Sequence, residues 1–218
     1  ANELGARDIC NIYGATENYG NCCVTPYHWS LQQRATCQGP PLPGGSIRIR
    51  NLENGHLVGP GEVGEIEVHG YLTRGYDGNS AYANAQSFTD DGYFRTSDLG
   101  SLDAEGHLHF AGRRSEMIKR SGINVSPAEV EEALQQHAAE ALAGVAGIEE
   151  ESRGAIIVAY LVARPGHTIV AAGVKKFCRE RLSRYKVPDR LVVVESLPLT
   201  ATGKLMRREL KALATKGE

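Results

Sequence analysis

The stretch AGRRSEMIKRSGINVSPAEVEEAL, residues 111–134, marks where the chain changes from one kind of fold to another. Before it, short segments alternate apolar and polar residues between glycine-rich turns, and after it helical and strand patterns mix. Near its end, Ser126 can cap a helix, Pro127 suits the first helical turn, and Glu129 takes the capping-box position. Its first residues, AGRRSE, are small or charged, which suits a hinge. The stretch therefore predicts an α+β protein built from two parts.

The part before the hinge, residues 1–112, is expected to form a small antiparallel or barrel-like β unit. Its alternating segments are GSIRIRNLENGHLVG (45–59), GEIEVHG (64–70) and GHLHFAG (106–112). In the first of them, Ile47 and Ile49 alternate with arginines, and the dipeptide Asn54-Gly55 is typical of a hairpin turn. Alternation with a period of two indicates strands that bury one face.

The part after the hinge, residues 113–218, is expected to form a small α/β domain. A continuous apolar strand, GAIIVAYLVA (154–163), precedes a helix that carries Val174, Phe177 and Cys178 on one face. The remaining expected elements are a strand (RLVVVESLP, 190–198), a loop (TATGK, 200–204) and a closing helix (LMRRELKAL, 205–213).

The composition excludes several classes of protein. With 218 residues, 41% of them hydrophobic, the chain is long enough for one large or two small cores. Its formal net charge of −2 argues against nucleic acid as a partner. Five cysteines without a C-x-x-C motif suit a reduced compartment, and the longest apolar run is too short to span a membrane. We therefore expect a cytoplasmic protein.

Single motifs in this chain are weak when each is taken alone. PLTATGKLMRREL resembles a phosphate loop, but Pro198 replaces the first glycine and Leu205 replaces the magnesium-binding Ser or Thr. Lys204 alone is explained as a solvated lysine beside a basic helix, and Asp98 alone as a turn aspartate. His107 and His109 fit an exposed strand face, because a metal site would need further ligands that the sequence does not supply.

Taken together and in order, the motifs are far more specific. They are NIYGATE (11–17), GEVGEIEVHG (61–70), GYFRTSDLG (92–100), the stretch 111–134, and LPLTATGKLMRREL (197–210). The chain thereby resembles the adenylate-forming superfamily, which includes acyl-CoA synthetases, peptide-synthetase adenylation domains and firefly luciferase. The resemblance covers essentially the whole chain. Its signatures are Y-G-x-T-E, G-E-x-G-E-I, Y-R-T-G-D-L, G-R-x-x-x-x-I-K and T-x-T-G-K.

The resemblance implies that the chain is the C-terminal portion of a longer enzyme. In the family, a longer segment precedes Y-G-x-T-E and carries the Ser/Thr/Gly-rich phosphate loop and most of the carboxylate pocket. Residues 1–112 would then be the end of the large AMP-binding domain, and residues 113–218 the small mobile domain. The expected partners are the missing N-terminal part, a carboxylic acid, ATP with Mg²⁺, and coenzyme A or the phosphopantetheine of a carrier protein.

The family reaction has two steps, and the resemblance implies a role for each matching residue in the first part of the chain. A carboxylate first attacks the α-phosphate of ATP, and a thiol then displaces AMP from the acyl-adenylate. Tyr13 would lie against the adenine, and Asn11 would contact the edge of the base. Thr16 would offer its hydroxyl to the α-phosphate, and Glu17 would bind Mg²⁺. Asp98 would accept hydrogen bonds from the ribose hydroxyls.

The remaining roles fall at and beyond the hinge. Arg113 would donate to the ribose, and Lys204 would bridge the carboxylate and the α-phosphate during adenylation. After a rotation of the small domain, the backbone at Gly122 would line the pantetheine channel. Two positions depart from the family pattern. Ser115 occupies the pivot, where Asp or Lys is usual, and Ser97 stands where Gly usually precedes the ribose aspartate.

Three functions remain open at this point. NVSPAEVEEAL and LTATGKLMRREL are closer to acyl-CoA synthetases than to peptide-synthetase domains, which favours CoA as the acceptor. The alternatives are an adenylation enzyme that loads a separate carrier protein, and a binding or regulatory module without catalysis. Intact Thr16, Glu17, Asp98, Arg113 and Lys204 argue against the last for the parent protein. The sequence does not identify the carboxylic acid substrate, because in the family the pocket for this acid lies mostly upstream.

Overall fold

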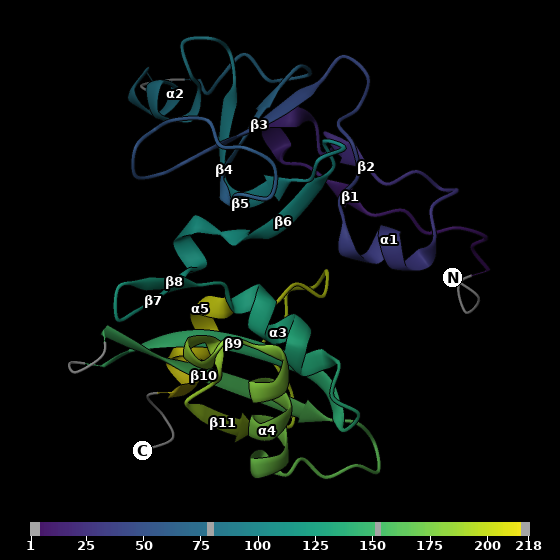
Figure 1. The fold of residues 1–218 in the computed structure, drawn as a ribbon, viewed down its shortest axis with the longest axis vertical. Coiled ribbons are helices and arrows are strands. Elements are labelled where there is room, and N and C mark those ends of the chain that lie inside the picture. The colour runs from purple at the N-terminus through teal and green to yellow at the C-terminus, as the bar shows by residue number, and fades with distance from the viewer. Residues whose placement is uncertain (1–4, 78–80, 151–153, 215–218) are drawn as a thin grey trace. The chain divides into compact units, whose positions relative to one another are not determined.

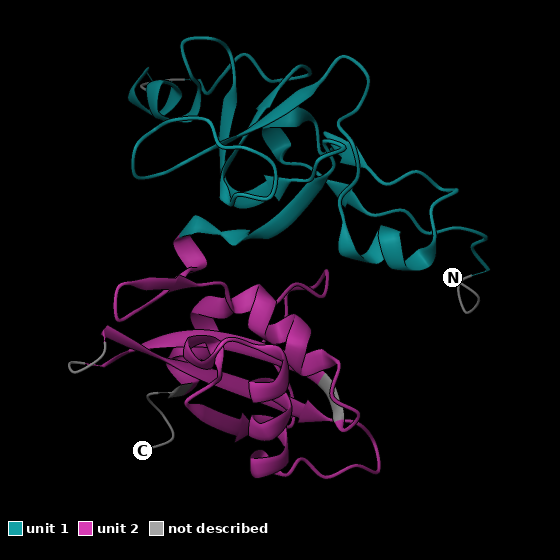
Figure 2. Cartoon of the chain, viewed as in Figure 1, with its two compact units in different colours: residues 1–114 teal, residues 115–218 magenta. Residues whose placement is uncertain are grey.

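The computed structural model describes residues 5–77, 81–150 and 154–214. The chain divides into two compact units, Ala1–Arg114 and Ser115–Glu218 (Figure 2). This division lies two residues beyond the boundary predicted between residues 112 and 113.

The centre of the first unit is a four-stranded antiparallel sheet (Figure 1). Its order is β3-β4-β5-β6, formed by Ser46–Arg50, Gly64–His69, Phe94–Leu102 and Leu108–Arg113. The expected antiparallel strands are therefore confirmed. The sheet is not a closed barrel, because the described residues of β3 and β6 form its two open edges. A second, two-stranded sheet joins β1 (Ile12–Tyr13) to β2 (Cys23–Val24).

The core of the first unit lies between these two sheets. Its buried members come from β1, from β2 and the residue before it, from β3 and β4, and from the start of β6: Tyr13, Cys22, Cys23, Ile49, Ile66, Val68 and Leu108. Cys22 and Cys23 thus fill space in the core. The short helices of this unit, η2 (Thr16–Asn18), α1 (Leu31–Thr36) and α2 (Ala81–Ser87), have no fully buried apolar side chain. Weak burial explains why their sequences show no amphipathic pattern.

The second unit is a three-stranded sheet covered by helices (Figure 1). Its order is β11-β10-β9, with β9 (Glu140–Glu150) antiparallel and β11 (Arg190–Val193) parallel to the central β10 (Gly154–Ala163). The other elements are η3 (Arg114–Glu116), β7 (Ile118–Arg120), β8 (Ile123–Val125), α3 (Pro127–Gln135), α4 (Ala171–Arg181), η4 (Arg184–Lys186) and α5 (Arg207–Ala214). The predicted mixed fold of this part is therefore confirmed.

Central strand β10 buries both of its faces, which explains its continuous apolar sequence. Ile157, Ala159 and Leu161 pack with side chains of α3 and α4, whereas Val158 and Tyr160 pack with Leu197 and with Leu210 of α5. The two sets alternate along the strand, as the period of two requires.

In the part of the chain that the structure describes, no helix has the length and apolar character needed to cross a bilayer.

Two predicted boundaries differ from the structure, and one strand was not predicted. The strand predicted over 190–198 spans only Arg190–Val193, and the closing helix begins at Arg207 because Leu205 forms a bridge with Leu199. Strand β9 was not predicted, since its sequence EALAGVAGIEE is rich in Ala and Gly. The glycines are needed there for close packing. A Cβ at Gly147 would lie 2.8 Å from the Ile118 side chain.

Candidate active site

The first cluster of predicted site residues joins β1, β5 and β6. The Tyr13 hydroxyl donates a hydrogen bond of 2.8 Å to Asp98 Oδ2, and Arg113 Nε lies 3.6 Å from Asp98 Oδ1. Asp98 and Arg113 are directly paired in the β5–β6 ladder, which explains their proximity. Burial, followed by the charge of Asp98, raises the pKa of Tyr13. The phenol therefore stays neutral and serves as a donor to the carboxylate.

A bulge in β5 presents Asp98. Glu65 pairs with Leu99 and Glu67 with Arg95, so residues 96–98 all lie opposite the single residue between these two glutamates. The Thr96 hydroxyl donates to the backbone carbonyl of Ile66 at 2.9 Å and accepts the Asp98 N–H at 3.1 Å. The bulge is thus held by a side chain that satisfies backbone groups outside the ladder.

The residue before Asp98 has a left-handed backbone. Ser97 has φ 59°, a conformation that glycine adopts without the steric penalty of a Cβ. This geometry gives a physical reason for glycine being usual at this position in the family. Serine at this exposed site retains the conformation at a modest energetic cost, on the order of 1–2 kcal/mol.

The loop that carries Thr16 and Glu17 is a tight turn built on one 3₁₀ helix, Thr16–Asn18. The buried Asn18 side chain accepts the Ala15 N–H at 2.7 Å, and Gly20 N–H donates to the Ala15 carbonyl at 2.7 Å. A Cβ at Gly14 would lie only 2.5 Å from the backbone of Asn21, so only glycine fits there. The turn leaves the Thr16 side chain exposed to solvent.

Glu17 is held by a residue that sequence reasoning missed. The Tyr76 hydroxyl donates to Glu17 Oε1 at 2.6 Å, and the backbone N–H of Thr73 donates to the Glu17 carbonyl at 2.8 Å. The hydrogen bond to Glu17, together with burial, raises the pKa of Tyr76. Glu17 is partly exposed, so its carboxylate can also reach a cation. No signal in the sequence links these two residues, which are 59 positions apart.

Asn11 lies next to the Tyr13 cluster but is tied to another loop. Its side-chain amide donates to the Cys37 carbonyl at 3.0 Å, and its backbone N–H donates to Thr25 Oγ1 at 2.7 Å. One N–H of the amide is therefore engaged, and the side-chain oxygen could serve as an acceptor for a base. Phe110 was also missed, although its ring lies 6.0 Å from that of Tyr13 between centroids.

The other predicted residues belong to the second unit. Ser115 lies in η3, and Gly122 lies in the turn between β7 and β8 with φ 82° and open space where a Cβ would be. Lys204 is exposed, at the end of a loop closed by two hydrogen bonds. Its N–H donates to Thr200 Oγ1 at 3.0 Å, and its carbonyl accepts the Thr200 N–H at 2.8 Å.

A buried ion network fixes the chain on both sides of these residues. Arg207, three positions after Lys204, donates to Glu116 Oε2 at 2.6 Å, to both carboxylate oxygens of Glu131, and to the Val145 carbonyl at 3.1 Å. Glu131 also accepts the Val145 N–H at 2.7 Å. The network therefore connects the start of α5 with α3, β9 and the residue after Ser115.

Within each unit, then, the structure brings some of the predicted residues together. Tyr13, Asp98 and Arg113 form one cluster in the first unit, with Thr16 and Glu17 on the loop that follows β1. Gly122 and Lys204 lie in separate turns of the second unit. The arrangement of the first unit offers an aromatic ring, a carboxylate acceptor, a hydroxyl and a second carboxylate, which suits a ribonucleotide and its cation.

Comparison with known proteins assigns both parts of the chain to described families. A family profile described as "AMP-binding enzyme" matches residues 1–77, and one described as "AMP-binding enzyme C-terminal domain" matches residues 129–204. The 2-succinylbenzoate–CoA ligase of Geobacillus kaustophilus is 39% identical over 211 residues, which are 96% of this chain and 42% of that protein. The indoleacetate–CoA ligase of Aromatoleum aromaticum is 36% identical over 210 residues, 95% of this chain and 40% of that protein.

Solved structures give the same result. The o-succinylbenzoate CoA synthetase of Bacillus subtilis, in complex with an acyl-adenylate intermediate, superposes with a TM-score of 0.83 at 37% identity. The match covers 96% of this chain and 42% of that one. The chain thus spans less than half the length of the relatives it matches.

Proposed function

Because the chain belongs to the adenylate-forming superfamily of AMP-binding enzymes, and corresponds to its C-terminal portion, we propose that it is part of an AMP-forming acid–CoA ligase. The reaction would join a carboxylic acid to ATP with release of pyrophosphate, and then exchange AMP for the thiol of CoA. The observation that carries the proposal is the Tyr13–Asp98–Arg113 cluster, in which motif residues from distant parts of the chain meet.

The cluster supports a ribose-binding role for Asp98. Its Oδ2 already accepts one hydrogen bond from Tyr13, and a carboxylate has further lone pairs for the two ribose hydroxyls. Arg113 beside it balances the charge and can donate to the ribose. The ring of Tyr13 offers a flat face to the adenine, and the side-chain oxygen of Asn11 can accept from the exocyclic amine of the base.

Thr16 and Glu17 support the phosphate end of the site. Mg²⁺ commonly binds one or two carboxylates together with phosphate oxygens and water, and the partly exposed Glu17 fits that donor set. When bound, the ion would offset negative charge that builds on the phosphate oxygens. Tyr76 holds one carboxylate oxygen of Glu17, so the other oxygen is directed by a fixed side chain. The exposed hydroxyl of Thr16 can donate to the α-phosphate.

In the second unit, we assign the two half-reactions to different turns. Lys204 serves adenylation, when a mobile cation can neutralise the carboxylate and the α-phosphate together. The turn at Gly122 serves thioester formation, since a residue without a side chain lets pantetheine pass close to the backbone. Ser115 would be the pivot between the two arrangements. The CoA ligases among the relatives favour CoA over a carrier protein as the acceptor.

The proposal leaves the acid unassigned. The two relatives described above are named for 2-succinylbenzoate and for indoleacetate, which differ in charge and in ring system. Residues of the acid pocket lie mostly in the segment that precedes Y-G-x-T-E in the family.

Pyrophosphate exchange with the chain alone and with a fused chain tests the proposal. We expect no acid-dependent exchange between ATP and labelled pyrophosphate from the 218 residues alone, because the upstream phosphate loop is needed to hold both reactants in near-attack geometry. Fusing the chain behind the upstream segment of the Bacillus subtilis relative should restore exchange with that relative's acid. Exchange by the chain alone, or a folded fusion that binds ATP without exchanging, would contradict the proposal. CoA and a carrier protein are then compared as acceptors.

Asp98→Ala in such a complete enzyme should lower kcat/KM for ATP about 10- to 100-fold, because the ribose loses a charged acceptor of two hydrogen bonds. The check is steady-state kinetics with ATP varied. Asp90→Ala, at an exposed position of the same unit, is the matched control and should leave the ATP dependence unchanged. Equal effects of the two variants would remove the ribose role from Asp98.

Gly122→Leu should abolish most CoA transfer while sparing pyrophosphate exchange, because a branched side chain would project into the pantetheine path. Gly166→Leu is a matched control. Both glycines have positive φ and open space at the Cβ position, so both variants carry the same backbone cost, on the order of 1–2 kcal/mol. Separate assays of exchange and of thioester formation read the two half-reactions. Unimpaired CoA transfer in Gly122→Leu would show that this turn does not enter the site.

A further inference from the structure

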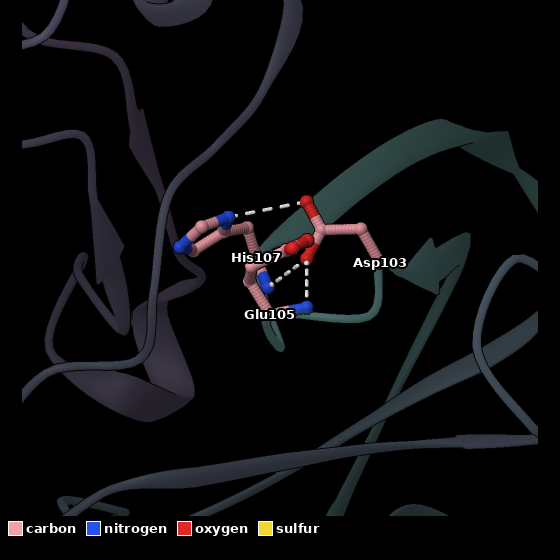
Figure 3. A group of neighbouring side chains, drawn as sticks. All are labelled: Asp103, Glu105 and His107. Atoms are coloured by element: carbon pink, nitrogen blue, oxygen red, sulfur yellow. Dashed lines mark hydrogen bonds and ion pairs between the residues drawn. The ribbon is translucent and has the colours of Figure 1, made fainter.

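A second group of polar side chains gathers at the hairpin between β5 and β6, and the proposed ligase reaction does not use it. Asp103, Glu105 and His107 each bring a ligand atom within 4.8 Å of the others (Figure 3). His109, in β6 two residues after His107, lies on the same side, with its Nε2 at 3.1 Å from Asp103 Oδ2. The His107 Nδ1 is also 3.1 Å from this oxygen.

The two oxygens of Asp103 have different surroundings. Oδ1 accepts the backbone N–H groups of Glu105 at 3.1 Å and of His107 at 2.8 Å, which fixes the carboxylate within the turn. Oδ2 instead faces one nitrogen of each imidazole, His107 Nδ1 and His109 Nε2. Burial raises the pKa of Asp103, but the hydrogen bonds from His107 and His109 outweigh it and lower that pKa. The carboxylate is therefore ionised and oriented before any ligand arrives.

The imidazole of His107 is oriented as well. Its ring packs edge-on against Trp29, with ring centroids 4.7 Å apart and an interplanar angle of 76°. His107 and His109 flank the fully buried Leu108, so both rings are directed to the face opposite the core. The contact with Trp29 and the backbone of the strand thus orient the imidazoles, just as the backbone N–H groups orient the carboxylate.

We propose that Asp103, His107 and His109, with Glu105 beside them, form a binding site for a divalent cation of the zinc class. Two ligand atoms bound about 2.1 Å from one tetrahedral zinc lie roughly 3.4 Å apart, close to the 3.1 Å that separates each imidazole nitrogen from Asp103 Oδ2. Imidazole with carboxylate suits zinc and its neighbours better than magnesium or calcium, which prefer oxygen ligands only. The fixed Oδ1 supplies the outer-shell support that orients metal-binding carboxylates.

Binding would exchange the shared protons of the cluster for the cation. The imidazole nitrogens must be unprotonated to bind the cation. The site is independent of the proposed ligase reaction. If the experiment disproves the cation site, the proposed ligase function is unaffected, and the reverse also holds.

Isothermal titration of the full chain with zinc chloride at pH 7.5 tests the site. We expect one ion per chain, with affinity at least about tenfold lower in His107→Gln, in His109→Gln and in Asp103→Asn. His56→Gln, at an exposed histidine in another loop of the same unit, is the matched control and should bind as the parent chain does. No zinc binding would overturn the site, and so would binding that all three variants leave unchanged, because it would place the ion elsewhere, for example on the free cysteines.

A substitution could unfold the hairpin and so abolish binding indirectly. Nuclear magnetic resonance of the imidazole nitrogens in the unaltered chain avoids this problem. In the unaltered chain, zinc should shift the His107 Nδ1 and His109 Nε2 signals together and leave His56 in place. Signals of His107 and His109 that do not respond to zinc would show that the cluster serves only to stabilise the hairpin.

Discussion

Replacing Lys204 by alanine in a complete enzyme that contains this chain should slow acyl-adenylate formation about 100- to 1,000-fold, a loss of roughly 2.7–4 kcal/mol of barrier lowering. The reason is electrostatic. Attack of the carboxylate on the α-phosphate concentrates negative charge on oxygens, and an exposed lysine on a tight loop can reach them without being buried beforehand. Thioester formation from a supplied acyl-adenylate needs no such charge and should change far less.

The comparison of the two half-reactions is what makes the Lys204 experiment specific. Lys176→Ala, at an exposed lysine of α4, controls for the loss of one surface charge from the same unit. A variant that only destabilised the second unit would slow both half-reactions together. Equal losses in adenylation and in thioester formation would therefore contradict the assignment, even if the total activity fell as expected.

Much of the fold could be predicted from local patterns, and the exceptions have physical causes. The alternating segments correctly placed β3, β4 and β6, and a capping residue correctly placed the start of α3 at Pro127. Strand β5 was missed because its bulge at 96–98 interrupts the alternation that identifies strands. Strand β9 was missed because Gly144 and Gly147 are selected for close packing rather than for strand propensity.

The candidate site was predictable in its members but not in its contacts. Motif spacing identified Tyr13 and Asp98, but their hydrogen bond joins residues 85 positions apart and depends on how two sheets pack. Tyr76 could not have been found at all, since it contacts Glu17 from a segment with no recognisable pattern. His107 and His109 were assigned to an exposed strand face because the sequence does not show that the turn before them brings the Asp103 carboxylate into contact with both imidazoles.

Replacing Arg207 by leucine should lower the free energy of unfolding of the second unit by about 3–5 kcal/mol, the usual cost of leaving a buried charge without its partner. Glu131 is only 8% exposed and would keep one backbone hydrogen bond, from Val145, after losing two from the guanidinium. Glu116 would lose its ion pair too. Urea denaturation of the whole chain measures the change in the free energy of unfolding. Native-state hydrogen exchange at the β9 amides shows whether the loss lies in the second unit.

Two further variants separate the charge effect from the loss of a long side chain. Arg208→Leu, at the exposed next position of α5, should cost less than about 0.5 kcal/mol. The double variant Arg207→Leu/Glu131→Leu removes both charges and should recover most of the stability, because apolar residues often replace a buried ion pair at little net cost. Since Arg207 joins α5 to the residue after Ser115, its loss should also loosen the Lys204 loop and the predicted pivot together. A stable Arg207→Leu chain would mean that the network contributes little, and that packing of Leu210 against β9 and β10 alone holds α5 in place.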